Sequence, residues 1–382
     1  MIKKKLNIIN NLLILIVLMS KKFQYFKKNI NFRKRRYKRK FLSSKYKSLI
    51  ILFLSTVFIG VYLIRKSHNK IHIAMNMDNR YIYSCIVFLT SLLNNRAKST
   101  FYIFHILTNN QTSQESMNKI KSIIKKFGNN RAKVIFYNLK DDFEGVPIKG
   151  YPLTVYYRIA TPKILSNVDK IIYSDLDMLN FKDLSELYNT KFKKDMYICA
   201  VLDDFYWKKE LKKVGIEINK YVNSGILLMD LKSMRENSIE KKLRDFIATN
   251  NLLWPDQTAI NAICRDNIQI ISYKYNLYAW SSYSRFVNIN NGQIPMYRVN
   301  ISELYQAYHE PTNAHFLGNF KPWNRERDSL YKNYWWYFAK KSGFYNEILK
   351  YYKYDINYAE SLINTIPEDG GLLKGNYKKF SS

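Results

Sequence analysis

With 382 residues, the chain is long enough to bury a substantial core in one large α/β domain with additions. Its formal net charge of +32 would suggest a nucleic acid as partner, but about 19 basic residues and no acidic residue fall in residues 1–70, and no base-reading motif accompanies them, so we expect no nucleic-acid partner. Cys85, Cys199 and Cys264 lie far apart without a CxxC spacing, so neither a cysteine zinc site nor a disulfide framework is indicated.

Residues 1–47 form a basic N-terminal tail, which we expect to be solvated near anionic lipid head groups. Residues 48–64 (SLIILFLSTVFIGVYLI) are uncharged and apolar over about 17 residues, which predicts a transmembrane anchor. More basic residues precede this segment than follow it, so the positive-inside rule predicts a single-pass type II membrane protein with a signal-anchor and a Golgi or ER lumenal domain. A bacterial source would instead place that domain on the cytoplasmic side of the inner membrane, and whether residues 6–19 also span the membrane stays open.

Beyond this segment, short apolar runs alternate with longer amphipathic stretches. Strands are predicted at 71–75, 101–107, 134–138, 168–175, 196–203 and 225–231, and helices at 81–93 and from about 113 to 128. This order predicts a Rossmann-like α/β fold with a mixed, mostly parallel sheet and helices on both faces. The GxGxxG and GxxxxGK[ST] phosphate-binding motifs do not occur in the sequence, so any phosphate must be held in another way.

The most informative segment is the apolar strand 171–174, which runs directly into Asp175 and Asp177. Ligands of open α/β sheets bind beyond the carboxyl ends of strands. Side chains at i and i+2 of an extended segment share one face, so both carboxylates can bind one divalent cation, and that cation can neutralise a departing diphosphate. A lone pair with this spacing is more often only the polar start of a loop, but the preceding strand favours a metal site.

A second group of residues recurs at intervals of three in the segment 315–323 (HFLGNFKPW). His315 can complete a carboxylate metal site, Gly318 lets backbone N–H groups approach a phosphate, and Lys321 offers that phosphate a positive charge. Together with the carboxylate pair, these residues predict a site that holds a pyrophosphate. Mixed oxygen and imidazole ligands favour Mn²⁺, with Mg²⁺ as the alternative.

From about residue 71 to 323, the sequence resembles glycosyltransferase family 8, which contains glycogenin, galactinol synthase and bacterial lipopolysaccharide galactosyl- and glucosyltransferases. The matching segments, in the family's order, are IHIAMNMDNRYIYSCIVFLTSLL, YYRIATPKIL, DKIIYSDLDMLNFKDLSELY, ICAVLDD, YVNSGILLMDLKSMRE, WPDQTAINAIC and HFLGNFKPW. The resemblance implies a GT-A catalytic domain at 71–325. Residues 326–382 would follow it as an aromatic and basic C-terminal extension, which we expect to pack as helices rather than to lie on a membrane surface.

The resemblance also implies the functional residues. The metal ligands would be Asp175, Asp177 and His315. The donor would be bound by Asp78, Tyr81, Arg158, Asp175, Leu176, Asp177, Gly318 and Lys321, and the donor-sugar pocket with its candidate catalytic residues would comprise Asp203, Asn223, Asp256 and Gln257. Plainer explanations are that Tyr81 is the first apolar residue of a helix, Asn223 part of a turn, and Asp256 an N-cap.

The implied function is that of a retaining, metal-dependent hexosyltransferase, which moves glucose or galactose from a UDP-sugar to a hydroxyl of a glycan, glycolipid or glycoprotein. The acceptor would attack from the face that UDP leaves, and a phosphate oxygen would take its proton. A double displacement needs a nucleophile: Gln257 is an amide and a poor one, and Asp256 or Asp203 could substitute. The alternatives are a catalytically inactive glycan-binding relative and a basic membrane-associated scaffold acting through residues 1–70.

Overall fold

The computed structural model divides the chain into two compact units, Met1–Ser67 and His68–Ser382. The described residues are Ser55, 69–139, 142–143, 145–146, 151–203, 211–212, 214–217, 220–279 and 301–367. The predicted tail, the predicted anchor apart from Ser55, and the last part of the predicted C-terminal extension lie outside the described residues.

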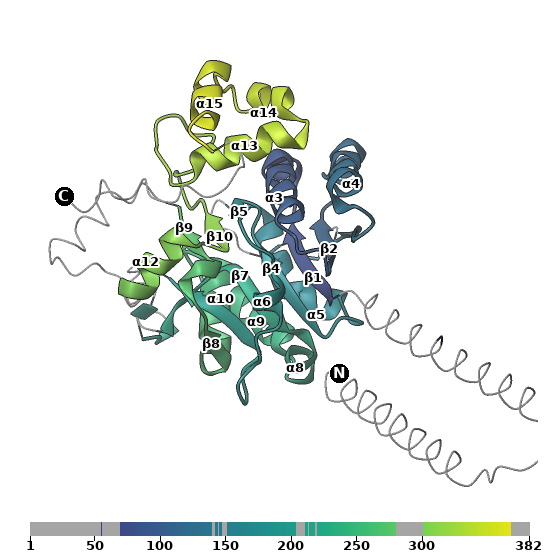
Figure 1. The fold of residues 1–382 in the computed structure, drawn as a ribbon. Coiled ribbons are helices and arrows are strands. Elements are labelled where there is room, and N and C mark those ends of the chain that lie inside the picture. Colours follow the sequence, from purple (N-terminus) through teal and green to yellow (C-terminus); the bar gives the residue numbers. More distant parts are fainter. Residues whose placement is uncertain are drawn as a thin grey trace, which may run out of the picture. The chain divides into compact units, whose positions relative to one another are not determined.

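Within the described residues, seven strands form the main sheet, in the order β3-β2-β1-β4-β7-β6-β8 (Figure 1). Strand β7 runs antiparallel to both β4 and β6, while the other neighbouring pairs are parallel. The strands are β1 (Asn69–Asn76), β2 (Thr100–Thr108), β3 (Ala132–Asn138), β4 (Lys170–Ser174), β6 (Ile198–Leu202), β7 (Val222–Asp230) and β8 (Ile268–Ile270). The predicted mixed, mostly parallel sheet is therefore observed.

Helices cover both faces of this sheet, because its strands carry apolar side chains on both sides. In β4, Ile172 packs into the core on one face, while Ile171 and Tyr173 pack into the core on the other. The first core includes residues of α3 (Ile82–Asn94) and α4 (Gln114–Gly128), and the second includes residues of α5 (Tyr157–Ile164), α8 (Leu231–Glu236), α9 (Ile239–Thr249) and α10 (Pro255–Cys264). This double burial explains the unbroken apolar run before Asp175.

A smaller sheet of three strands, in the order β5-β10-β9, brings the two predicted motifs together. Strand β5 (Met178–Asn180) begins directly after Asp177 and pairs antiparallel with β10 (Asn313–His315). In this register His315 lies opposite Met178, and the backbone N–H of Phe316 donates to the carbonyl oxygen of Asp177 at 2.8 Å. His315 therefore lies beside the carboxylate pair at the carboxyl end of β4.

Helices that follow the smaller sheet pack beside α3 (Figure 1). Trp335 and Trp336 are fully buried in the same core as α3, so this part of the chain packs as helices, as expected. The helices after β9 (Leu277–Tyr278) are α12 (Ile301–His309), α13 (Lys332–Ser342), α14 (Tyr345–Tyr351) and α15 (Ile356–Ile363). Short elements elsewhere are α6 (Ser185–Tyr188), η1 (Asn79–Tyr81), η2 (Leu153–Tyr156), η4 (Arg265–Asn267) and η5 (Tyr273–Tyr275).

The prediction of a single-pass type II membrane protein with a transmembrane signal-anchor is contradicted. Spanning a bilayer takes roughly 20 apolar residues in one helix. In the described parts of the chain, no helix has both the length and the apolar character that a membrane span requires. This corrects the predicted anchor, the membrane partner and both membrane localisations, although residues 48–64 themselves, apart from Ser55, are not among the described residues.

Buried His105 and half-buried His72, neighbours on the main sheet, are expected to make stability depend on pH. Nδ1 of His72 lies 2.9 Å from Nε2 of His105, and Nδ1 of His105 lies 3.0 Å from the hydroxyl of Tyr137. Burial lowers the pKa of His105 to about 4, and the nearby His72 and Lys133 add to the effect. An unperturbed histidine has a pKa of about 6.5, so between these two pH values the unfolded chain binds a proton that the folded chain does not.

The free energy of unfolding is therefore expected to fall as the pH drops from 6.5 towards 4. His105 alone would account for about 2–3 kcal/mol of the decrease in the free energy of unfolding over this pH range. Urea unfolding at pH 7 and pH 4.5 measures the loss, and His105→Gln, which cannot take up the proton, should show a smaller one. An equal loss in the variant and the parent would show that His105 is not the group responsible.

Candidate active site

A cavity of about 700 Å³ lies beyond the carboxyl ends of β1 and β4, where open α/β sheets bind ligands. It brings together most of the residues that the sequence predicts for the site. These lining residues are Tyr81, Arg158, Asp175, Leu176, Asp177, Asp203, Asn223, Asp256, Gln257, His315, Gly318 and Lys321. Of the predicted residues, only Asp78 is not among those that line it.

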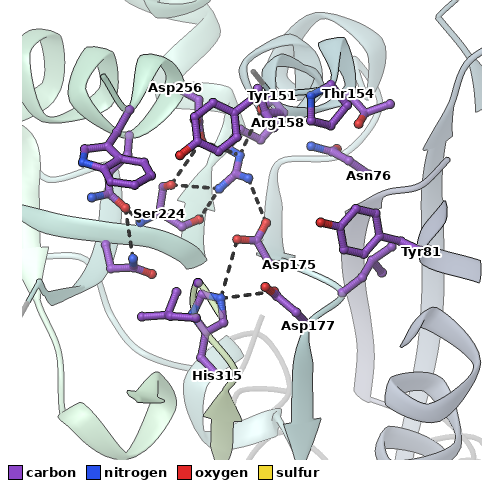
Figure 2. A pocket seen from close by; sticks show the side chains of 18 of the residues that line it. Asn76, Tyr81, Tyr151, Thr154, Arg158, Asp175, Asp177, Ser224, Asp256 and His315 are labelled. Atoms are coloured by element: carbon purple, nitrogen blue, oxygen red, sulfur yellow. Dashed lines mark hydrogen bonds and ion pairs between the residues drawn. The ribbon is translucent and has the colours of Figure 1, made fainter. Parts of the chain in front are cut away.

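Asp175, Asp177 and His315 point towards one another at one side of this cavity (Figure 2). Nε2 of His315 lies 3.2 Å from Oδ1 of Asp177 and 3.9 Å from Oδ2 of Asp175. One ligand atom from each residue lies within 4.8 Å of the other two. Two carboxylate oxygens and one imidazole nitrogen at this spacing fit a divalent cation such as Mn²⁺ or Mg²⁺.

Asp175 has one oxygen that contacts the protein and one that faces this cluster. Oδ1 accepts hydrogen bonds from Nη2 of Arg158 and from the hydroxyl of Tyr173, both at 2.8 Å. Burial raises the pKa of Asp175, and the positive charge of Arg158 only partly opposes this effect. Oδ2 is therefore the oxygen that Asp175 can offer to a cation. Tyr173 was not predicted as a site residue, although its i−2 position before Asp175 puts both side chains on one face of the strand.

Asp177 lies between His315 and Lys321. Its Oδ2 forms an ion pair with the ammonium of Lys321, which also donates to the carbonyl oxygen of Phe316. Burial acts to raise the pKa of Asp177, but Lys321 and His315 outweigh it and hold the pKa well below its usual value. The ion pair with Asp177 thus places the positive charge of Lys321 directly beside the candidate metal ligands. Gly318, in the same segment, has a φ of 53°, a left-handed conformation that glycine adopts without strain.

Arg158, which is 5% exposed, joins Asp175 to a second carboxylate, Asp256. Its Nε lies 3.0 Å from Oδ2 of Asp256, and its Nη1 donates to the carbonyl oxygen of Ser224 at 2.6 Å and to the Ser224 hydroxyl at 2.9 Å. The guanidinium carbon also lies 4.4 Å from the centre of the Tyr173 ring. Figure 2 shows Asp175 between Arg158 and His315, so Arg158 links the candidate metal ligands to the other carboxylate of the cavity.

The remaining predicted residues form a chain of side-chain hydrogen bonds. Nδ2 of Asn223 donates to Oε1 of Gln257 at 3.0 Å, and Nε2 of Gln257 donates to Oδ2 of Asp203 at 2.7 Å. Asn223 lies within β7 rather than in a turn, and the carboxylate of Asp256 pairs with Arg158 rather than capping α10. Both plainer explanations for these two residues are therefore wrong.

The wall of the cavity across from the carboxylates contains Tyr81 and Asn76 (Figure 2). Burial raises the pKa of Tyr81 to about 12, helped by Asp177 and Asp78, so its hydroxyl stays neutral at pH 7. Asn76, which was not predicted, ends β1, and among the described residues its buried amide group has no hydrogen-bond partner. Its only sequence signal is a polar side chain that follows an apolar strand.

Asp78 has a structural contact instead. Its Oδ1 accepts a hydrogen bond from the backbone N–H of Arg80 at 2.9 Å, which caps η1, and its Oδ2 lies 2.8 Å from the Arg80 guanidinium. Asp78 is not among the residues that line the cavity, and its predicted contact with the donor stays a prediction.

Sequence comparison identifies relatives of the chain. The sequence model of glycosyl transferase family 8 matches residues 72–327. A putative glycosyltransferase of Haemophilus influenzae (strain ATCC 51907 / DSM 11121 / KW20 / Rd) is 29% identical over 214 residues, which cover 54% of this chain and 62% of that protein. General stress protein A of Bacillus subtilis (strain 168) is 26% identical over 190 residues, which cover 48% of this chain and 63% of that protein. The chain thus spans less than two thirds of the length of either relative.

Solved structures share the fold. The apo structure of the WbbM bifunctional glycosyltransferase has a TM-score of 0.62 at 16% identity, and the match covers 74% of this chain and 51% of that one. The galactosyltransferase LgtC, solved with donor and acceptor sugar analogues, has a TM-score of 0.58 at 21% identity, with 71% of this chain and 96% of that chain covered. At these identities the likeness concerns the fold alone, and it confirms the predicted GT-A-like α/β architecture.

Proposed function

The chain belongs to glycosyl transferase family 8, and from that membership we propose that it transfers glucose or galactose from a UDP-sugar to a hydroxyl group of a glycan, glycolipid or glycoprotein. The observation that carries this proposal is the cluster of Asp175, Asp177 and His315 beside Lys321, within a cavity of about 700 Å³. A cavity of this size suits a nucleotide-sugar, and the cluster suits the diphosphate that such a donor contains.

The residues around the cluster can hold the parts of the donor. Asp175, Asp177 and His315 would hold Mn²⁺ or Mg²⁺, which supplies positive charge to the departing diphosphate. Lys321 adds a second positive charge, and the left-handed backbone at Gly318 lets a phosphate approach closely. Across the cavity, the ring of Tyr81 offers a flat surface on which uracil can stack.

The contacts of the candidate nucleophiles favour direct attack over a double displacement, and either route would retain the anomeric configuration. Gln257 is an amide that uses its nitrogen on Asp203 and its oxygen on Asn223. Asp256 is held by Arg158 and by the Ser224 hydroxyl at 3.1 Å. Because these groups are already bonded within the protein, we favour direct attack by the acceptor hydroxyl from the face that UDP leaves. The bond from the acceptor oxygen to the anomeric carbon forms as the bond to the phosphate oxygen breaks, and a UDP oxygen takes the proton.

Donor turnover tests the proposed reaction. The full chain with Mn²⁺ is incubated with UDP-glucose and UDP-galactose, with the matching GDP- and ADP-sugars as controls, and the released nucleoside diphosphate is measured. We expect UDP release from at least one UDP-hexose and none from the controls. Release from GDP- or ADP-sugars alone would contradict the proposed donor. If the chain neither turns over nor binds any UDP-sugar, the result favours the glycan-binding alternative.

A further inference from the structure

We propose that Asn276 is a positioning residue, which holds the His315 ring in the tautomer that leaves Nε2 free to bind a cation. The inference rests on the proposed function, because it assigns a role to a residue outside the proposed metal site. Asn276 is fully buried and does not line the cavity. Any effect that it has on a ligand must therefore pass through another side chain.

Asn276 contacts His315 because two strands of the smaller sheet bring them together. It directly precedes β9, which pairs in parallel with β10, so that Tyr278 lies opposite His315. Oδ1 of Asn276 lies 2.9 Å from Nδ1 of His315. On its other side, Nδ2 of Asn276 donates to Oδ1 of Asn223 at 2.8 Å. Asn276 thus connects the candidate metal ligand to the residues of the donor-sugar pocket.

Two backbone N–H groups determine which way the neighbouring amides point. The N–H of Gly225 donates to Oδ1 of Asn223 at 2.8 Å, and the N–H of Ser224 donates to Oε1 of Gln257 at 3.1 Å. A backbone N–H can only donate, so the atom that it contacts in each side chain must be the oxygen. Asp203 supports the same orientation of Gln257. An ionised carboxylate can only accept, so the atom of Gln257 that donates to Asp203 must be the amide nitrogen.

These orientations fix the hydrogen on the imidazole. Since Oδ1 of Asn223 is an acceptor, Asn276 must turn its nitrogen towards it and its oxygen towards His315. Nδ1 of His315 therefore carries the hydrogen, and in a neutral imidazole Nε2 then has the free lone pair. Nε2 is the atom that faces Asp175 and Asp177.

Gly225 holds the same ring from the side of β7. A Cβ atom at this position would lie 2.3 Å from Cε1 and 2.7 Å from Nδ1 of His315, which is closer than real atoms approach. The backbone of β7 therefore packs directly against the imidazole. Together, Gly225 and Asn276 restrict both the position and the tautomer of His315.

The affinity of the full chain for Mn²⁺ without nucleotide tests this role. Electron paramagnetic resonance measures the concentration of the free ion and so gives this affinity. Asn276→Ala removes the acceptor for the Nδ1 hydrogen and should weaken Mn²⁺ binding about 10- to 100-fold. Asn276→Asp keeps an acceptor of the same shape and should bind Mn²⁺ within about threefold of the parent. The second oxygen of Asp at this position would face Oδ1 of Asn223 with no hydrogen between them, and the two oxygens would repel each other. Because Asn223 lines the cavity, turnover of the UDP-sugar should still fall.

Asn180→Ala is the matched control, because Asn180 is a fully buried amide of the same small sheet that donates to Asn313 at 2.9 Å and does not contact His315. It should lower stability and leave Mn²⁺ affinity unchanged. A folded Asn276→Ala variant with the Mn²⁺ affinity of the parent would overturn the inference. If the parent itself binds no Mn²⁺, the proposed metal site fails, and ¹⁵N NMR of labelled histidine still decides the tautomer: an Nε2–H signal without an Nδ1–H signal for His315 would overturn the inference, and an Nδ1–H signal would support it.

Discussion

Replacing Asp177 by alanine is expected to lower metal-dependent turnover of the UDP-sugar by at least about a thousandfold. The change removes the oxygen that lies 3.2 Å from Nε2 of His315, and so removes one of three candidate metal ligands. It also leaves Lys321 without its carboxylate partner beside the cluster. UDP release at saturating donor, with and without Mn²⁺, measures the effect.

Asp169→Ala is the control for this prediction, because Asp169 is an exposed carboxylate whose ion pair with Arg235 spans 3.3 Å. It should keep the turnover of the parent within about twofold, as expected for a surface ion pair. Normal turnover in a folded Asp177→Ala variant would reject the assignment of Asp177 to the metal site.

Replacing Arg158 by methionine is expected to lower the free energy of unfolding by about 3–5 kcal/mol. Burial acts to lower the pKa of Arg158, but Asp175 and Asp256 outweigh it and raise the pKa above its usual value, so the guanidinium is charged. Its removal leaves these two carboxylates without their positive partner in a largely buried place. Urea unfolding at pH 7 in the absence of metal measures the loss.

Two further variants show whether the lost stability comes from the missing charge of Arg158 or from general damage to the core. Arg244→Met removes an arginine that pairs with Glu240 and Asp142 and whose side chain is 24% exposed, against 6% for Arg158, so it should cost about 1 kcal/mol or less. Arg158→Met combined with Asp256→Asn should be more stable than Arg158→Met alone, because one unpaired carboxylate is removed with its partner. A double variant no more stable than the single one would show that the loss comes from packing rather than from charge.

The parts of the site that the sequence predicts are those encoded by neighbouring residues. The apolar run before Asp175 marks a strand buried on both faces, and the i, i+2 spacing puts Asp175 and Asp177 on one side of the chain. That His315 joins them was predicted from the segment 315–323 and from the family resemblance, but the sequence does not show how the two segments meet. The contact depends on the pairing of β5 with β10, which are distant in the sequence.

Residues whose roles depend on packing were missed or misplaced. Nothing local distinguishes Asn276 from the many other asparagines of the chain, because its contact with His315 exists only after β9 pairs with β10. The role of Gly225 depends on an imidazole from another strand. Asp78 does not line the cavity and its carboxylate contacts Arg80, two residues along, so its contact with the donor stays a prediction. The apolar composition of residues 48–64 predicted an anchor that the described helices do not support.

The most direct test of the account is the position of Mn²⁺ in crystals of the protein grown with UDP, measured by anomalous diffraction at the manganese edge. The account predicts one strong peak within about 2.0–2.6 Å of an oxygen of Asp175, an oxygen of Asp177 and Nε2 of His315, with the diphosphate of UDP on its open side. A peak elsewhere, or UDP bound in the cavity with no manganese among these three residues, would contradict it.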